Sequence, residues 1–404
     1  MVCGDLIILL IILALLLLLF FFRSLPESNQ VLPSNCNQSS LVETIRLDRP
    51  KRVRIMLPTG GSGLIQDARL YEALIPNSYI IQVDRNSPDS HIEAKIKVDV
   101  NLYLESVLAS SYFPSNERWL MVNQEYFWPN HAEIVDVLIT KSRYAYRLVS
   151  EYVKKVDFLA DVVYLGHTSF PPRQHEDQDK NWNLCLHLAG RSRNKGTWQL
   201  IHTWQKEGGF RHIAPNATLV ITCRHRCLNR ITNETTNLIP NQQGWSDPNT
   251  GLYIYTYLDE DELDRYRRKA GLFICPSLVE GYGQYINEGS ASRSIVMTTD
   301  FPPMNELVPV ESRFLIPPEL TLPSYQIMGP FGFLEPYLTG KHLPTSEACL
   351  PNFSEMARLL REYFSLSQED KEKLAEDYFE CYRQQQQNFR SALAEFLISR
   401  YNNE

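Results

Sequence analysis

The chain has 404 residues and a formal net charge of -7, with 44% hydrophobic and 22% charged residues. These proportions are typical of a globular protein of about two or three domains, and they exclude a disordered chain, a collagen and a polytopic membrane protein. Eight cysteines in a chain of this length do not indicate a small disulfide scaffold, and the mild acidic excess gives no reason to expect nucleic acid as a partner.

The first element is an apolar run at residues 6–22, which contains no polar side chain. Seventeen helical residues span about 26 Å, which is at the short end for a bilayer crossing. A cleaved signal peptide is the alternative, but no Lys or Arg precedes the run, and Phe20 to Arg23 follow it where small residues would mark a cleavage site. We therefore expect a retained transmembrane anchor at 1–23, in an ER-type or Golgi-type membrane, followed by a stem at 24–50.

The orientation of this anchor stays open. Arg23 and the basic residues that follow it favour a cytosolic body by the positive-inside rule. Four Asn-x-Ser/Thr sequons, which begin at Asn37, Asn216, Asn233 and Asn352, would suit a lumenal body.

Residues 51–172 show a first α/β pattern. The expected strands are 52–57, 79–83, 119–122, 135–140 and 161–165, with helical spacing at 64–74 and 142–155. Strands that alternate with helices predict a mostly parallel sheet.

A polar, proline-led stretch at 171–180 separates a second α/β pattern, which we assign to 181–350. Its expected strands are 184–188, 218–222, 252–256, 272–275 and 294–298, with helices at 197–206, 259–270 and 285–291. The remaining residues, 351–404, are expected to be helical, with a capping box at Ser367 and Asp370. Two such domains leave a cleft at the carboxyl ends of their strands, where α/β sheets bind ligands.

The most informative stretch is 271–308, which reads as strand, loop, glycine-flanked turn, helix and strand. Glu280 lies in the loop and Glu288 lies on the helix, which begins near Gln284. A helix amino terminus favours an anion, and the glycines allow the backbone to approach a ligand closely. The alternative is that Glu280 and Glu288 are two solvated acids without a ligand. A pair of glutamates at this spacing is common, whereas this whole series of residues between two apolar strands is rare, so we favour a ligand site.

This stretch resembles the donor-site signature of the family 4 glycosyltransferases, the retaining Glu-x7-Glu group with the GT-B fold. The resemblance rests on Pro-Ser-Leu-Val-Glu-Gly-Tyr-Gly at 276–283 and Glu-Gly-Ser-Ala at 288–291. A second loop, Gly-Arg-Ser-Arg-Asn-Lys-Gly at 190–196, resembles the family's Gly-Arg…Lys-Gly loop. The likeness is strong over 184–308 and weaker elsewhere.

The resemblance implies an α/β fold with two Rossmann-like domains facing across a cleft, preceded here by one transmembrane helix. The domain at 51–172 would face the acceptor, and the domain at 181–350 would bind the nucleotide-sugar. Arg191 and Lys195 would neutralise the diphosphate, Glu288 would bind the ribose hydroxyls, and Glu280 would hold the hydroxyls of the donor sugar. The backbone and side chains of the turn would line the pocket; they are Gly281, Tyr282, Gly283 and Gln284.

Two further candidates come from the amino-terminal half. The loop that contains Gly61 and Gly63 lies where such enzymes bring backbone amides near the donor phosphates, although a tight strand-to-helix turn is equally compatible with it. The family often has a catalytic histidine in this domain, and His131 is our candidate, with a structural histidine as the alternative. Arg293-Ser294 and Phe301-Pro302-Pro303 depart from the family pattern near the donor sugar, so the sugar stays open.

The implied activity is transfer of a sugar, with retention, from a nucleotide-sugar to a glycan, glycoprotein or lipid-linked acceptor. No cofactor and no essential metal are expected. Cys223 and Cys227 lack a second Cys or His pair at zinc-site spacing nearby, so they do not predict a metal site. A sugar-nucleotide epimerase and an inactive glycan-binding relative are the alternatives, and the joint presence of Arg191, Lys195, Glu280 and Glu288 argues against the inactive relative.

Overall fold

The computed structural model describes residues 44–59, 62–83, 96–108, 111–127, 129–172, 180–223, 238–324, 326 and 346–401. The expected anchor at 6–22, most of the stem and Gly61 lie outside these residues. Among the helices that are described, none is long and apolar enough to cross a membrane. All described residues belong to one compact unit, Ser40–Glu404.

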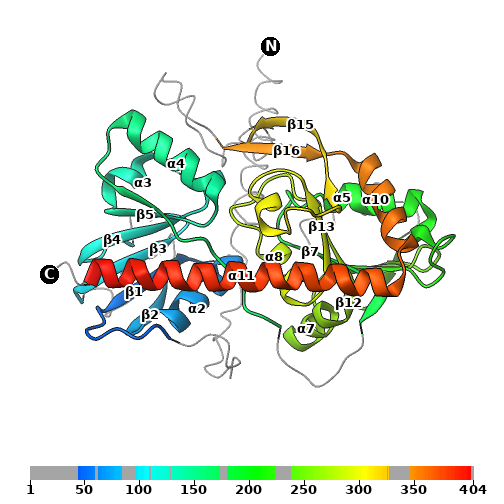
Figure 1. Cartoon of the computed structure of the whole chain (residues 1–404), viewed down its shortest axis with the longest axis horizontal. Coiled ribbons are helices and arrows are strands. Elements are labelled where there is room, and N and C mark those ends of the chain that lie inside the picture. Colours follow the sequence, from blue (N-terminus) through cyan, green and yellow to red (C-terminus); the bar gives the residue numbers. More distant parts are fainter. Residues whose placement is uncertain are drawn as a thin grey trace, which may run out of the picture. The chain divides into compact units, whose positions relative to one another are not determined.

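The first sheet has six parallel strands in the order β2-β1-β3-β4-β5-β6 (Figure 1). Its strands are β1 (Val53–Pro58), β2 (Ser78–Val83), β3 (Val98–Leu104), β4 (Ser115–Val122), β5 (Val137–Thr140) and β6 (Asp161–Tyr164). The helices between them are α2 (Ser62–Leu74), η3 (Gln124–Tyr126), α3 (Pro129–Ile134) and α4 (Arg143–Val156). The predicted parallel α/β sheet is confirmed, and β3 is a strand that the sequence analysis did not anticipate.

The second sheet has eight strands in the order β14-β13-β12-β7-β8-β11-β10-β9. Its strands are β7 (Asn181–Gly190), β8 (Thr218–Cys223), β9 (Ile239–Asn241), β10 (Gly244–Asp247), β11 (Leu252–Tyr255), β12 (Ala270–Cys275), β13 (Ile295–Thr299) and β14 (Leu315–Ile316). The strands from β14 to β11 run parallel, and β10 and β9 are added antiparallel at the edge. The associated helices are α5 (Thr197–Lys206), η4 (Gly208–Phe210), α7 (Glu260–Lys269), α8 (Gln284–Ala291) and η5 (Met304–Leu307).

Helices α4 and α7 begin where a side chain caps the first turn. Ser142 accepts a hydrogen bond from the backbone N–H of Ala145 at the start of α4, and Asp259 accepts one from Glu262 at the start of α7. Helix α7 also has three acidic residues in its first turn and three basic residues in its last turn. These charges interact favourably with the helix dipole and so stabilise the helix, which explains why so polar a segment is helical.

The carboxyl-terminal region crosses from the second sheet to the first. After the two-stranded sheet of β15 (Pro318–Pro323) and β16 (Glu347–Pro351) come α10 (Phe353–Ser365) and the 34-residue helix α11 (Gln368–Tyr401). Tyr378 belongs to the core of the second sheet, whereas Phe389 and Phe396 belong to the core of the first. The Phe396 ring lies 4.8 Å from the ring of Trp119 on β4. Figure 1 shows α11 running along both sheets.

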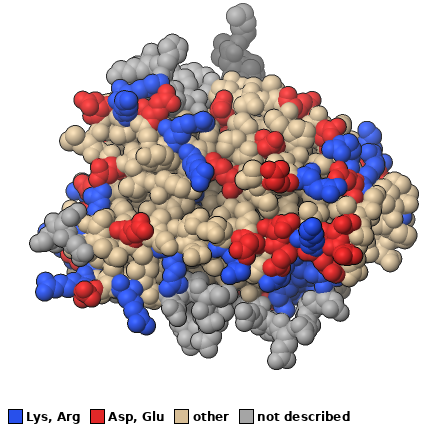
Figure 2. All heavy atoms as spheres, viewed as in Figure 1, with Lys and Arg blue, Asp and Glu red and all other residues tan. Residues whose placement is uncertain are grey.

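Of the capping box predicted before α11, the cap by Ser367 is confirmed, since the Asp370 N–H donates to Ser367 Oγ over 3.1 Å. The first half of α11 presents acidic residues to solvent, and they gather at the lower right of the face shown in Figure 2. The helix is therefore solvated on one side and buried on the other, as expected for an amphipathic surface helix.

Candidate active site

A cavity of about 550 Å³ is lined by residues that follow the strands of both sheets. From the first sheet, Glu105 follows β3, Asn123 follows β4 and Lys141 follows β5. From the second sheet, the lining includes the loop after β7 and the loop after β12. The cavity therefore lies at the carboxyl ends of the parallel strands, where the sequence analysis placed the ligand cleft.

The two motifs of the second sheet are packed directly on one another. The N–H of Leu278 donates to the carbonyl oxygen of Asn194 over 2.7 Å, so the loops at 190–196 and 276–283 are joined by the backbone. Gly196, with φ +66°, ends the first loop, and a Cβ there would lie 2.3 Å from the carbonyl oxygen of Pro276. Glycine is required at this position by both the backbone angle and the close approach.

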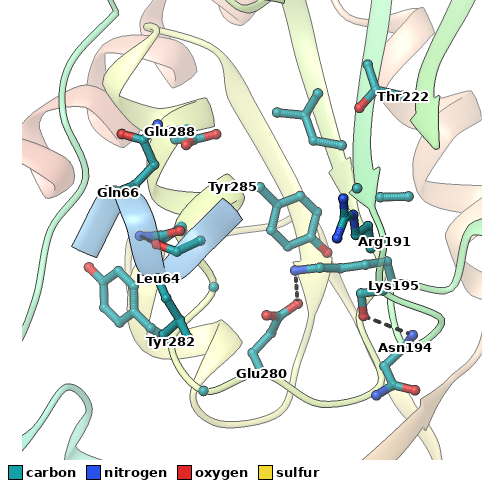
Figure 3. A pocket seen from close by; sticks show the side chains of 18 of the residues that line it. Leu64, Gln66, Arg191, Asn194, Lys195, Thr222, Glu280, Tyr282, Tyr285 and Glu288 are labelled. Atoms are coloured by element: carbon teal, nitrogen blue, oxygen red, sulfur yellow. Dashed lines mark hydrogen bonds and ion pairs between the residues drawn. The ribbon is translucent and has the colours of Figure 1, made fainter. Parts of the chain in front are cut away.

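Lys195 and Glu280 form an ion pair inside the cavity, with Nζ and Oε1 2.5 Å apart (Figure 3). The Lys195 Nζ also lies 3.9 Å from the centre of the Tyr285 ring. Ser277 Oγ donates to the same Glu280 oxygen and lies 2.5 Å from the Tyr285 hydroxyl. These contacts hold the ammonium and the carboxylate in place before any ligand binds, and Arg191 lies beside them.

The glycine-flanked turn leads into helix α8. Gly283 has φ +105° and is the N-cap residue, and no side chain caps the helix. The Tyr282 hydroxyl donates to the carbonyl oxygen of His167 over 2.7 Å, which anchors the turn to the segment that follows the first sheet. An amino terminus left uncapped by side chains, next to Lys195, is an environment that favours an anionic group.

Glu288 lies one turn further along α8 and also lines the cavity. Its Oε2 is 3.0 Å from Nη2 of Arg267, which lies on α7. Both side chains are partly exposed to the cavity. Arg267 was not singled out from the sequence, because one arginine in the basic last turn of α7 carries no distinguishing pattern.

A buried polar cluster connects α8 to the first sheet. Gln284 Nε2 donates to Asp67 Oδ1 over 2.5 Å and to the carbonyl oxygen of Gly63 over 3.3 Å. Asp67 also pairs with Lys141 at 3.3 Å and with Nε2 of His167 at 2.7 Å. Burial alone would raise the pKa of Asp67, but these two partners outweigh it and lower the pKa to about 2.

The loop residues after β3 and β4 form what we call the first-sheet wall, defined as Glu105, Asn123 and Glu125. The Asn123 amide donates to Glu105 Oε2 over 2.7 Å. Asn123 and Glu125 are 8% and 7% exposed, and Asn123 Oδ1 and Glu125 Oε2 have no hydrogen-bond partner among the residues that the structure describes. Burial and the nearby carboxylates of Glu105 and Glu280 together raise the pKa of Glu125 to about 8, against a backbone hydrogen bond and the attraction of Lys141.

Most of the residues predicted from the motifs line this one cavity. They are Gly63, Arg191, Lys195, Glu280, Gly281, Tyr282, Gly283, Gln284 and Glu288. Asp67 and the first-sheet wall also line it and were not predicted. The usable signal for the wall was the polar triplet Asn-Gln-Glu at 123–125, placed directly after an apolar strand.

His131 does not lie among the residues that line the cavity. It is on α3, is 8% exposed, and its Nδ1 has no hydrogen-bond partner in the described part of the chain. Burial lowers its pKa to about 4, so the ring is neutral at physiological pH. Its catalytic role stays a prediction.

Within the described ranges, no group of three or more His, Cys, Asp and Glu side chains is arranged to hold a metal ion. The carboxylates of the cavity instead pair with cations, as in Lys195 with Glu280 and Arg267 with Glu288.

No protein-family profile matches the chain, and a search of curated protein sequences finds no match. Comparison with solved structures does find similar folds. An α,α-trehalose-phosphate synthase (UDP-forming) from Burkholderia xenovorans has a TM-score of 0.57 at 10% identity, over 86% of this chain and 98% of that one. The corresponding enzyme from Burkholderia vietnamiensis has a TM-score of 0.53 at 10% identity, over 86% and 100%.

The pneumococcal O-GlcNAc transferase GtfA, solved with UDP and GlcNAc, has a TM-score of 0.50 at 12% identity. The match covers 75% of this chain but 57% of the transferase, so the chain corresponds to little more than half of that protein. At these identities the likeness is one of fold. The chain has the α/β fold with two parallel sheets that these glycosyltransferases share, which is the GT-B fold.

Proposed function

We propose that the protein is a retaining glycosyltransferase, similar to family 4, which moves a sugar from a nucleotide-sugar to a glycan, glycoprotein or lipid-linked acceptor. The observation that carries this proposal is the Lys195–Glu280 pair, held at 2.5 Å beside the uncapped amino terminus of α8 in a cavity between two parallel sheets. The GT-B fold of the structural neighbours supports it.

Each charged group then has a distinct part in binding the donor. Arg191 offers a planar guanidinium and Lys195 a point charge to the diphosphate, next to the backbone of the turn at 281–284. Glu288 accepts hydrogen bonds from the ribose hydroxyls, and Glu280 holds the hydroxyls of the sugar near the reacting carbon. Gly63 and Gly61 would bring the backbone of the first sheet's loop close to the phosphates.

In the reaction, the bond between the anomeric carbon and the phosphate oxygen breaks, and the bond between that carbon and the acceptor oxygen forms. The proton of the acceptor hydroxyl passes to the departing diphosphate. The sugar acquires oxocarbenium character as the diphosphate leaves, and the fixed cations stabilise the negative charge that develops on the leaving group. These side chains supply the charge in our proposal, so no essential metal or other cofactor is required.

The test is turnover of a panel of nucleotide-sugars by the full-length protein, with glycoside and glycolipid acceptors. Transfer from one of them, with NMR showing the same anomeric configuration in donor and product, is the expected result. Conversion of the nucleotide-sugar into an isomer without an acceptor would favour the epimerase instead. Absence of both transfer and hydrolysis for every donor would contradict an enzymatic function.

We also propose that residues 6–22 anchor the protein in an ER-type or Golgi-type membrane. The support is the seventeen-residue apolar run and the lack of a cleavage-site pattern after it. Retention in the membrane fraction after carbonate washing is expected. Protease protection of the carboxyl terminus in microsomes would show which side the catalytic body faces.

A further inference from the structure

The charges that line the cavity are unequally divided between its two sides. On the second-sheet side, Arg191, Lys195 and Arg267 contribute three cations. On the first-sheet side the lining has one cation, Lys141, which is 4% exposed and bound to Asp67. Each side also has three acidic residues, which are Glu260, Glu280 and Glu288 on the second-sheet side and Asp67, Glu105 and Glu125 on the first-sheet side. The formal charges therefore cancel on the second-sheet side, whereas acidic groups are in excess on the first-sheet side and oppose an anionic part of a substrate there.

The first-sheet wall presents hydrogen-bond acceptors that nothing in the described structure satisfies. Asn123 Oδ1 and Glu125 Oε2 are buried without a partner. A buried acceptor without a donor costs about 1–3 kcal/mol, so such atoms are usually matched by a ligand or by ordered water. Hydroxyl groups are suitable donors, whereas a phosphate or carboxylate would add further acceptor oxygens.

The first-sheet wall lies against the loop at 276–283, which contains Glu280 and Gly281. Gln124 Nε2 donates to the carbonyl oxygen of Glu280 over 2.5 Å. A Cβ on Gly281 would lie 2.6 Å from Asn123 Oδ1 and 2.8 Å from Glu125 Oε1. A group bound to Asn123 and Glu125 is thus placed next to the loop that, in our proposed function, holds the transferred sugar.

We infer that the first-sheet wall binds the acceptor as an uncharged sugar, through its hydroxyl groups, and selects against acceptors that carry a phosphate or carboxylate at that position. This inference rests on the proposed function, because the acceptor is defined by the transfer reaction. With burial raising the pKa of Glu125 to about 8, its carboxyl group is protonated at neutral pH, and it both donates to and accepts from a sugar hydroxyl.

The first test compares acceptors with the donor that the panel identifies. Uncharged p-nitrophenyl glycosides are measured against their 6-phosphate and uronic acid counterparts, using the full-length protein. We expect kcat/KM to favour the uncharged acceptor by about tenfold or more, which corresponds to about 1.4 kcal/mol. A preference for the charged acceptors would overturn the inference.

The second test uses variants of the wall. Glu125→Ala and Asn123→Ala should each raise the acceptor KM by about tenfold, a larger factor than the change in the donor KM of the same variant. Glu125→Gln keeps the shape of the side chain and its zero charge at neutral pH, so it should keep the discrimination against phosphorylated acceptors and separate loss of the wall from loss of folding. Glu133→Gln, at an exposed glutamate on α3 outside the cavity lining, is the matched control. Unchanged acceptor KM in both Glu125→Ala and Asn123→Ala would overturn the inference.

A binding measurement separates this inference from the proposed function. Saturation-transfer NMR with methyl glycosides and with glucose 6-phosphate, in the presence of UDP, needs no turnover. Glycoside signals that are stronger than those of glucose 6-phosphate, and that weaken in Glu125→Ala, support binding of an uncharged sugar at the first-sheet wall. This result counts even where no donor is turned over. Glycoside signals that are absent, or equal in wild type and variant, contradict the wall whatever the enzyme assay shows.

Discussion

On the second-sheet side of the cavity, Lys195 is held by Glu280 and Glu288 by Arg267, whereas on the first-sheet side Asn123 and Glu125 each keep a buried oxygen without a partner. The ion-paired side chains of the second-sheet side are already oriented, so they need little reorganisation when charge develops on the leaving group. This arrangement suits the diphosphate, the leaving group in our proposed function. The unpaired oxygens of Asn123 and Glu125 suit a ligand that supplies hydrogen-bond donors when it binds. The comparison indicates that one side of the cavity is preorganised and that the other is completed by its ligand.

The largest effect should come from removing the preorganised cation. Lys195→Ala takes away the charge that faces the leaving group and leaves Glu280 without its counter-ion, so turnover should fall by about 10²–10³-fold. Arg193→Ala is the control, because Arg193 belongs to the same loop but is exposed and outside the cavity lining. Steady-state rates of both variants on one donor test this, and near wild-type turnover in Lys195→Ala would contradict the assignment of the donor site.

The next effect concerns the cluster that joins the two sides. Lys141→Met leaves Asp67 buried without its lysine partner, so the free energy of unfolding should fall by about 3 kcal/mol. The exposed pair of Lys155 with Glu151 offers the control Lys155→Met, which should leave the unfolding midpoint unchanged. Denaturant unfolding of the two variants measures the difference, and equal midpoints would show that the buried pair contributes nothing.

A smaller effect is expected where the two sides touch. Gly281→Ala places a Cβ within 2.6 Å of Asn123 Oδ1, so the wall or the loop must shift, at a cost of about 2 kcal/mol. Asn123→Ala in the same chain removes the nearest atoms and should recover part of that loss. A double-mutant cycle on unfolding free energies tests the contact, and strictly additive effects would show that the two residues do not interact.

Per pH unit, the smallest effect is a dependence of stability on pH. Glu125 has an ordinary pKa of 4.5 when unfolded and a pKa of about 8 in the folded chain, where burial and the carboxylates of Glu105 and Glu280 outweigh Lys141. Between these values the folded state holds a proton that the unfolded state has released. Stability contributed by this group therefore falls as pH rises from about 5 to 8, by up to about 1.4 kcal/mol per pH unit.

Glu125→Gln cannot titrate and should remove that slope, while the Glu133→Gln control should keep it. Unfolding free energies from pH 5 to 8 measure both, and identical slopes in wild type and Glu125→Gln would contradict the raised pKa.

The sequence predicted the donor side of the cavity better than the wall, for a physical reason. Arg191 and Lys195 belong to one glycine-flanked loop, and Glu280 and Glu288 to one loop and the helix that follows it, so two short stretches of chain carry their signal. Asp67 on α2, Glu105 after β3 and Asn123 after β4 meet only when the sheet order is known. No local pattern marks such a set.

The same contrast holds for the fold. Most strands of both sheets were predicted because they are short apolar runs, but β3 was not, since Asp99 and Asn101 interrupt its apolar residues. In the structure Asn101 is buried, and its amide donates to the carbonyl oxygen of Phe113 over 2.8 Å, while Arg54 of the neighbouring strand donates to its side-chain oxygen. Hydrogen bonds to residues distant in the sequence satisfy Asn101 in the sheet. The local hydropathy pattern contains no sign of these bonds, so it does not predict the strand.

Helix α11 has a consequence for the order in which the chain folds during synthesis. Phe389, Leu393, Phe396 and Leu397 fill the core of the first sheet, although its strands end at Tyr164. Synthesis proceeds at about 5–20 residues per second, so these strands wait roughly 12–50 seconds before residue 397 is made. During that time an apolar face of the sheet lacks the part of its cover that α11 supplies, so we expect the nascent first half to bind chaperones.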